Sequence, residues 1–380
     1  MVRSKRVLAS LLLAVSAVTI ARGGHELPVY PSYYPHEIEI ATLGSEQAAE
    51  RLLAGKLHAY VGGTLPPASA PADKVTSVES LGAFVIVRLN PESPLASDEA
   101  SACAGTAAVI RDLAANGGAV IHPYPVTPFH GDYLNHAERA EAARQRLLRA
   151  DATPLPGKLA LRAQSALARS LVPPGRLAEG LRWDAALEEV SAAGLVADAT
   201  VVLNGWQGPR WVKSGWFHAY RLLAGSIADP ARRQEVDSTV ERLQAADLEG
   251  AVERVNLERH LVQLIASDCR TVVAGYTVKR EQLNVEFSAG VENIGFDSLQ
   301  GLASPMFLRT VKLKDFPWNG WLQLGLEARP ASAWNPIGGF TDEFGRLMWF
   351  AVGDAAAVPS PYDSTWMLNR ISDVEASPKR

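Results

Sequence analysis

The stretch AFVIVRL, from Ala83 to Leu89, is almost continuously apolar and decides the fold class. Such a run, rich in β-branched residues, is typical of a strand that is covered on both faces of a sheet. The segments around it alternate between the two-residue period of a strand and the 3.6-residue period of a helix. His36 to Thr42 shows the strand period, whereas Glu46 to Ala54 and Ser101 to Asn116 show helical spacing. This order predicts an α/β fold with a mostly parallel sheet.

The pattern changes twice further along the chain. Helical spacing dominates residues 151–268, including Lys158 to Leu171 and Trp183 to Ala193, with one strand expected at Ala199 to Leu203. Beyond Asp268, strand-like segments such as Phe307 to Leu313 alternate with loops rich in Pro, Gly and Trp. We therefore expect an α/β lobe at 24–150, a mainly helical region at 151–268, and a mixed β/loop, aromatic-rich C-terminal region at 269–380 that packs back on the first lobe.

Residues 1–23 have the three parts of a secretory signal peptide. Three basic residues stand among the first six, a mostly apolar run extends from Val7 to Ile20, and the small residues Ala21 and Gly23 suit a cleavage site. The apolar run is shorter than the roughly 20 residues that a membrane span needs. We expect cleavage after Gly23 and a bacterial periplasmic protein without an integral membrane segment; an uncleaved N-terminal anchor is the alternative.

The charge balance argues against nucleic acid as a partner. Loss of the signal peptide removes four basic residues and no acid, so that 33 Lys and Arg residues face 41 Asp and Glu residues. Nucleic-acid-binding proteins instead carry a basic patch or stripe. The sequence also contains no GxSxG, P-loop or GxGxxG motif, which removes the usual support for a serine hydrolase or a nucleotide-dependent enzyme.

Two cysteines, Cys103 and Cys269, are present in the whole sequence. An even count in an oxidising compartment permits a Cys103–Cys269 disulfide. Two buried free thiols are the alternative interpretation. Neither a metal-binding cysteine spacing nor a CxxCH haem motif occurs.

The densest group of reactive side chains lies in HPYPVTPFHGDYLNH, residues 122–136. The prolines stiffen a connection between a strand end and a helix start, where open α/β sheets bind their ligands. One hypothesis is a ligand site formed by His122, His130 and Asp132. A second is a zinc or copper site formed by His122, His130 and His136, because imidazole suits both metals. A structural loop in which the histidines cap and pack is the third interpretation.

Two aromatic groups add further candidates. Tyr33, Tyr34 and His36, in the stretch YPSYYPHE, suit a small-molecule cleft, which we expect them to share with His122 and His130; packing against the C-terminal region is the alternative. The tryptophans suit either packing between regions or an interface with an assembly partner. They form a cluster in the middle region and a second set near the C-terminus, namely Trp206, Trp211 and Trp216, then Trp318, Trp321, Trp334, Trp349 and Trp366.

Two stretches carry a resemblance to a known family. AAERLLAGKLHAYVGG (residues 48–63) and AFVIVRLNPESPLAS (residues 83–97) resemble a helix–turn–strand unit and a hinge-region strand of type II periplasmic solute-binding proteins, closest to the phosphonate/phosphate-like branch. The resemblance implies non-catalytic capture of a small ligand, with an anion as one option, in the service of a membrane transporter or a periplasmic redox system. A periplasmic metal-binding protein or metalloenzyme, and an assembly partner with a Trp-rich interface, remain the alternatives.

Overall fold

The structure is a computed structural model. It describes residues 35, 37–66, 74–148, 159–178, 180, 182–204, 209–315, 320–330, 342–353, 356–369 and 372. Among these residues, no helix is both long and apolar enough to cross a membrane.

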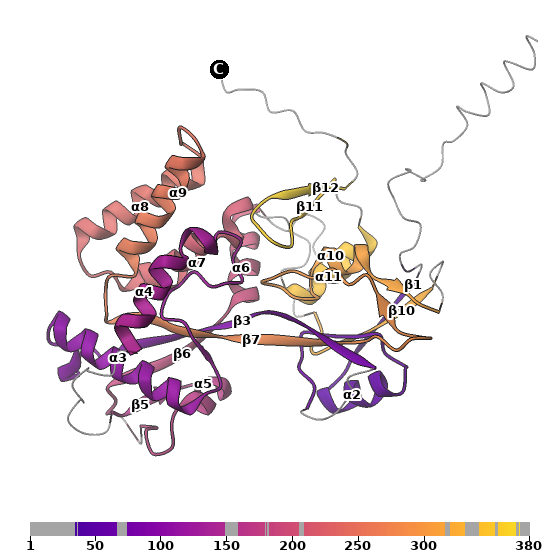
Figure 1. Ribbon diagram of the computed structural model, residues 1–380, viewed down its shortest axis with the longest axis horizontal. Helices are drawn as coiled ribbons and strands as arrows, with labels where there is room; N and C mark the ends of the chain where they lie inside the picture. Colours follow the sequence, from indigo (N-terminus) through magenta and orange to yellow (C-terminus); the bar gives the residue numbers. More distant parts are fainter. Residues whose placement is uncertain are drawn as a thin grey trace, which may run out of the picture.

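One mixed sheet forms the centre of the molecule, which confirms the predicted α/β fold (Figure 1). Its pairing is parallel at the two ends, between β1, β10 and β2 and between β5 and β6, and antiparallel at the centre. The short β4 pairs with β7. The strands, in their order across the sheet, are β1 (Glu37–Thr42), β10 (Trp321–Leu326), β2 (Ala59–Val61), β7 (Thr271–Asn284), β3 (Val75–Leu89), β6 (Ala185–Ser191) and β5 (Leu161–Ala163), with β4 at Val120–Ile121.

The long strands β3 and β7 run through two lobes and join them (Figure 1). The large lobe holds β5 and β6 with the helices α3 (Glu99–Asn116), α4 (Ala137–Leu148), α5 (Ala166–Leu171), α6 (Ala192–Asn204), α7 (Gly215–Leu223), α8 (Pro230–Ala245) and α9 (Ala251–Ile265). The small lobe holds β1, β2 and β10 with α2 (Ser45–Leu53), α10 (Pro305–Thr310), α11 (Glu343–Val352) and the pair β8 (Val291–Glu292) and β9 (Lys312–Leu313). A hairpin of β11 (Ala357–Pro359) and β12 (Trp366–Leu368) follows.

Short 3₁₀ turns link these elements at Pro94–Ala96, Tyr133–Asn135, Arg210–Lys213 and Ala224–Ser226. Each lobe has its own apolar core. Phe84 of β3 and Trp216 of α7 are fully buried in the large lobe, whereas Phe307 of α10 and Leu322 of β10 are fully buried in the small lobe. Each aromatic side chain contributes a few kcal/mol by its burial.

Four local predictions are wrong. The described part of the stretch Lys158 to Leu171, from residue 159, contains β5 followed by α5, and Trp183 to Ala193 contains β6 where a helix was expected. Conversely, Ala199 to Leu203 lies within α6, and the expected strand Phe307 to Leu313 is mostly α10. Long-range pairing decides the first two, because β6 pairs along its whole length with Ala83 to Leu89. A proline in the first turn favours α10.

All three sequence regions contribute strands to the one sheet. β1 to β4 come from the first region, β5 and β6 from the second, and β7 and β10 from the third. The lobes are therefore discontinuous in sequence. The predicted Cys103–Cys269 disulfide is present and ties α3 to the residues that precede β7; its Cα–Cα distance of 4.9 Å is ordinary for a disulfide.

Candidate functional site: the interlobe cleft

A bulge interrupts the pairing of β3 with β7 where these strands pass from one lobe to the other. The register shifts between Leu81 and Phe84. The backbone N–H of Ala83 turns to the side chain of Thr277, whose Oγ1 accepts it at 3.0 Å. A Cβ atom on Gly82 would lie 2.8 Å from the same oxygen, so the close approach of the two strands requires glycine there. Bulges bend strands, and here the bend coincides with the junction of the lobes.

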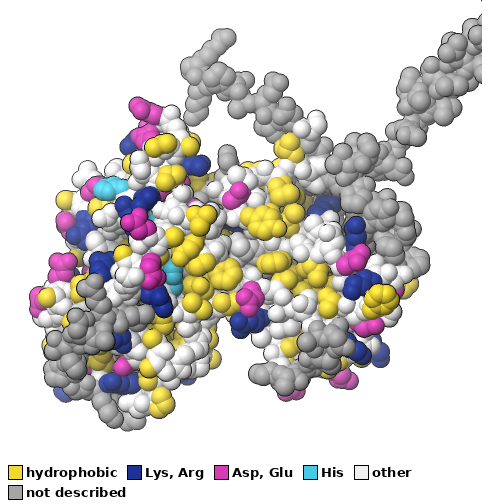
Figure 2. All heavy atoms as spheres, viewed as in Figure 1, with side chains coloured by type: hydrophobic (Ala, Val, Ile, Leu, Met, Phe, Trp, Pro, Cys, Tyr) yellow, Lys and Arg dark blue, Asp and Glu magenta, His cyan; other side chains and the backbone are white. Residues whose placement is uncertain are grey.

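An open cleft of about 690 Å³ lies across this bulge. Gly62, Glu327 and Glu343 line it from the small lobe, and Gly118, Leu167 and Glu189 line it from the large lobe. The bulge itself forms part of the lining. Figure 2 shows a notch between the two lobes, with oppositely charged side chains gathered at its inner end. The volume is in the range of small-molecule sites, which commonly lie between domains.

A buried carboxylate anchors the cleft at β7. Glu281 is fully buried, and its two oxygens accept the backbone N–H groups of Gly62 at 2.7 Å and Leu302 at 2.8 Å. The ammonium of Lys279 lies 3.4 Å from Glu281. Burial raises the pKa of Glu281, and Lys279 opposes this shift. Burial alone would lower the pKa of Lys279, but Glu281 and then Glu343 outweigh it and raise the pKa. Lys279 therefore keeps its charge.

Two acidic side chains of the cleft, Glu327 and Glu343, are less fully paired than its two cations. Lys279 is held by Glu281, and Arg280 pairs with Glu79 at 2.8 Å. By contrast, Glu327 is exposed, and the Oε2 atom of Glu343 is buried without a hydrogen bond from any described residue. This oxygen forms a long ion pair with Lys279, at 3.8 Å. A carboxylate oxygen in this position suits a donor from a ligand, and an ammonium group is the strongest such donor.

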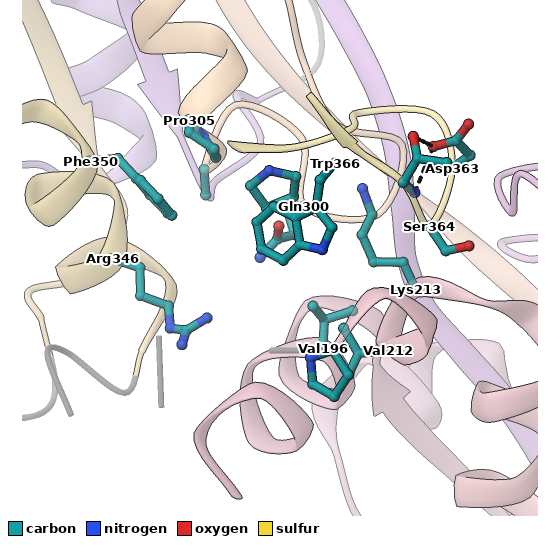
Figure 3. A pocket seen from close by; sticks show the side chains of 14 residues that line it. Val196, Val212, Lys213, Gln300, Pro305, Arg346, Phe350, Asp363, Ser364 and Trp366 are labelled. Carbon is teal, nitrogen blue, oxygen red and sulfur yellow. Dashed lines mark hydrogen bonds between the residues drawn. The ribbon is translucent and has the colours of Figure 1, made fainter. Parts of the chain in front are cut away.

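On the opposite side of β3 and β7, the space between the lobes is small. Figure 3 shows the cavity there, with Val196 and Val212 facing Gln300 and Trp366. Its volume of about 30 Å³ has room for about two water molecules. Beside it, the buried Lys213 donates to Asp297 at 2.5 Å and to the carbonyl of Ser360 at 2.6 Å. The open cleft is therefore the place between the lobes where an organic ligand fits.

The histidines of residues 122–136 lie in the core of the large lobe and do not line this cleft. The backbone N–H of Thr127 donates to Nδ1 of His130 at 2.9 Å, so the proton of His130 is on Nε2. That N–H donates to Nδ1 of His218 at 2.9 Å, and Nε2 of His218 donates to the carbonyl of Val212 at 3.0 Å. These hydrogen bonds use all four ring nitrogens of His130 and His218, which leaves none for a metal.

Burial keeps these imidazoles neutral. It lowers the pKa of His130 to about 3 and that of His218 well below its usual value. His122 points its Nε2 to the carbonyl of Val126 at 2.8 Å, and burial lowers its pKa as well. The expectation that His122 and His130 face a ligand cleft thus fails on geometry, because both side chains satisfy backbone groups of their own lobe.

His136 and Asp132 also have structural partners. His136 bonds through Nδ1 to the hydroxyl of Tyr124 at 3.0 Å, and burial lowers its pKa to about 4. Asp132 accepts the backbone N–H of Gly215 at the start of α7. Within the described ranges, no group of three or more His, Cys, Asp or Glu side chains is placed to hold a metal ion, so the zinc or copper hypothesis gains no support.

The other aromatic candidates fall into two groups, those outside the described residues and those whose positions the structure describes. Tyr33, Tyr34 and His36 lie outside the described residues, as do Trp206, Trp318 and Trp334. Trp211 and Trp216 pack with Phe217 in the large lobe, and Trp366 lines the small cavity of Figure 3. Trp321, at the start of β10, is 65% exposed. These four tryptophans therefore occupy separate places and do not form a single interface.

The sequence matches no protein-family model and no curated protein. Solved structures with a similar fold include the oligopeptide-binding protein AppA of Bacillus subtilis in complex with a nonapeptide (12% identity, 71% of this chain, 58% of that chain, TM-score 0.39). They also include the binding protein DppA of Helicobacter pylori in complex with the peptide STSA (13% identity, 71% of this chain, 55% of that chain, TM-score 0.41). A third is the periplasmic EDTA-binding protein EppA (15% identity, 72% of this chain, 57% of that chain, TM-score 0.40).

This chain spans a little over half the length of each of these three proteins. The likeness to these structures gives no support to the phosphonate/phosphate-like branch suggested by residues 48–97. Likeness at this level leaves the ligand of the present chain open, and the chemistry of the cleft is the guide to it.

Proposed function

We propose that the protein is a non-catalytic periplasmic binding protein that captures a small ligand bearing a primary ammonium group, such as a short peptide, in the interlobe cleft. The observation that carries the proposal is the cleft itself, which both lobes line and which crosses the bulge of β3 and β7. A ligand held there contacts both lobes and the strands that join them. Delivery to a membrane transporter is the corresponding role, and a signal peptide at residues 1–23 would place the protein in the right compartment.

Charge selects the ligand class. With Lys279 and Arg280 already paired, Glu343 and Glu327 dominate the field that a ligand meets. An anion would be repelled by this pair, whereas an ammonium group would supply the donor that Oε2 of Glu343 lacks. Hydrogen bonds to charged groups contribute about 1.5–3 kcal/mol, which corresponds to about a 10- to 150-fold change in affinity.

The test is retention of peptides from an equimolar library of di- and tripeptides, followed by calorimetry on those retained. We expect retained peptides to bind at least tenfold more weakly after N-acetylation, which removes the ammonium charge. The Glu343→Gln variant should lose affinity to a similar degree. Glu292→Gln, an exposed carboxylate in β8 outside the cleft, is the matched control and should bind like the wild type.

Three results would contradict the proposal. They are a library from which nothing is retained, N-acetylated peptides that bind as well as the free ones, and inorganic phosphate that competes for the same site.

A further inference from the structure

A second cavity lies inside the large lobe, away from the interlobe cleft. It has a volume of about 650 Å³ and lies between α3, α4, α9 and the first residues of β7. The Cys103–Cys269 disulfide borders it. Pro123 and Pro125 form part of its wall. The proline-rich segment of residues 122–136 therefore contributes to this cavity and not to the interlobe cleft. We call it the α4 groove.

The surface of the α4 groove is mainly apolar. Ala107, Ala143, Leu147, Leu223 and Val273 line it together with the two prolines. Its polar lining includes Gln263 and Thr271. An apolar cavity of this size with a few polar groups is the usual composition of a small-molecule site.

The charged side chains that line the groove are both cationic. Arg139 and Arg146 stand seven residues apart on α4, so they lie on the same face of the helix, two turns and about 10 Å apart. Among the described residues, no carboxylate forms an ion pair with either. In Arg139, Nη1 donates to the carbonyl of Arg259 at 2.5 Å, and the guanidinium also hydrogen-bonds to the side chain of Tyr124, which together hold it in place. A guanidinium has five N–H donors, so others are left for a ligand.

We propose that the α4 groove binds an amphipathic anion, namely a carboxylate on a single unbranched apolar chain. The guanidinium of Arg139 or Arg146 pairs with the carboxylate, because its fork of donors matches two carboxylate oxygens. The chain lies on the alanine, leucine and proline side chains of the wall. Two arginines without carboxylate partners on an apolar surface, in a chain with an excess of acidic residues, are the observation that selects this charge.

The experiment uses the protein without residues 1–23. The fluorescent probe is 11-(dansylamino)undecanoate, and dodecanoate and dodecanol serve as competitors below their aggregation concentrations. We expect saturable binding of the probe, displacement by dodecanoate, and at least tenfold weaker displacement by dodecanol, which has the chain without the charge. Arg139→Met and Arg146→Met together should weaken probe binding at least tenfold.

Two further variants make the result specific. Arg144→Met is the matched control, because Arg144 is exposed on the same helix, pairs with Glu141 at 3.7 Å and does not line the groove; it should bind the probe like the wild type. Ala142→Trp places a large side chain at an exposed position of the lining and should block the probe without changing any charge. Equal competition by dodecanol, unchanged affinity in the double arginine variant, or full binding by Ala142→Trp would overturn the proposal.

Discussion

Replacing Lys213 by methionine removes a cation that pairs with the buried carboxylate of Asp297. The two side chains are only 7% and 3% exposed, so the variant leaves a charge in the interior without its partner. Breaking a buried ion pair in this way costs about 3–5 kcal/mol. The backbone N–H groups of Leu299 and Gln300 still donate to Asp297 and offset part of the loss. We therefore expect the free energy of unfolding to fall by about 3 kcal/mol.

Urea denaturation of two further variants tests whether the unpaired charge of Asp297 causes the loss of stability. In Lys213→Met with Asp297→Asn, the carboxylate is also removed, and most of the lost stability should return. Arg242→Met breaks an ion pair of similar length, 2.6 Å to Glu253, whose side chains are 44% and 30% exposed, and should cost less than about 1 kcal/mol. A Lys213→Met variant within 1 kcal/mol of the wild type, or a double variant less stable than the single one, would refute the reasoning.

Two more predictions concern the stability contributed by the buried carboxyl group of Glu258 and by the disulfide. Burial, reinforced by the charge of Asp132, raises the pKa of Glu258 to about 7. The protonated carboxyl group therefore contributes its full stability below the pKa of the unfolded chain, and this contribution is lost as the pH rises through 7. Glu258→Gln should therefore raise the stability at pH 8 by up to about 3 kcal/mol and change it little at pH 4, as thermal unfolding at both pH values would show. Reducing the Cys103–Cys269 disulfide, which spans 166 positions, should lower the unfolding free energy by about 4–5 kcal/mol, measured by denaturation with and without reductant; equal midpoints would contradict this.

The sequence predicts those elements whose pattern is decided locally. The apolar run at Ala83 to Leu89 is a central strand, as expected, and the helix expected at Ser101 to Asn116 forms as α3. Trp183 to Ala193 fails because the spacing of Ala186, Leu187 and Val190 suits one face of a helix. The strand that forms instead buries the alternating residues Ala185 and Leu187. Only pairing with β3, about 100 residues away in sequence, selects the strand.

The candidate site was harder to predict for a related reason. The histidines attract attention as a short run, but their partners, such as His218, lie far along the chain and satisfy them in the core. The cleft residues carry a weaker signal, namely Lys279 and Glu281 within an otherwise strand-like stretch. A buried carboxylate in a strand requires a cation and backbone donors, but the sequence does not say which segments supply them.

The discontinuous lobes also set an order of assembly. β1 pairs with β10, so that Glu37 reaches its neighbour Trp321 only near the other end of the chain. β2 likewise lies between β10 and β7. Contacts so distant in sequence form slowly, because a long loop must close before they contribute any stability. Helices α8 and α9, which pack on each other as neighbours, can form early, whereas the sheet of the small lobe must wait until β10 is available to pair with β1 and β2.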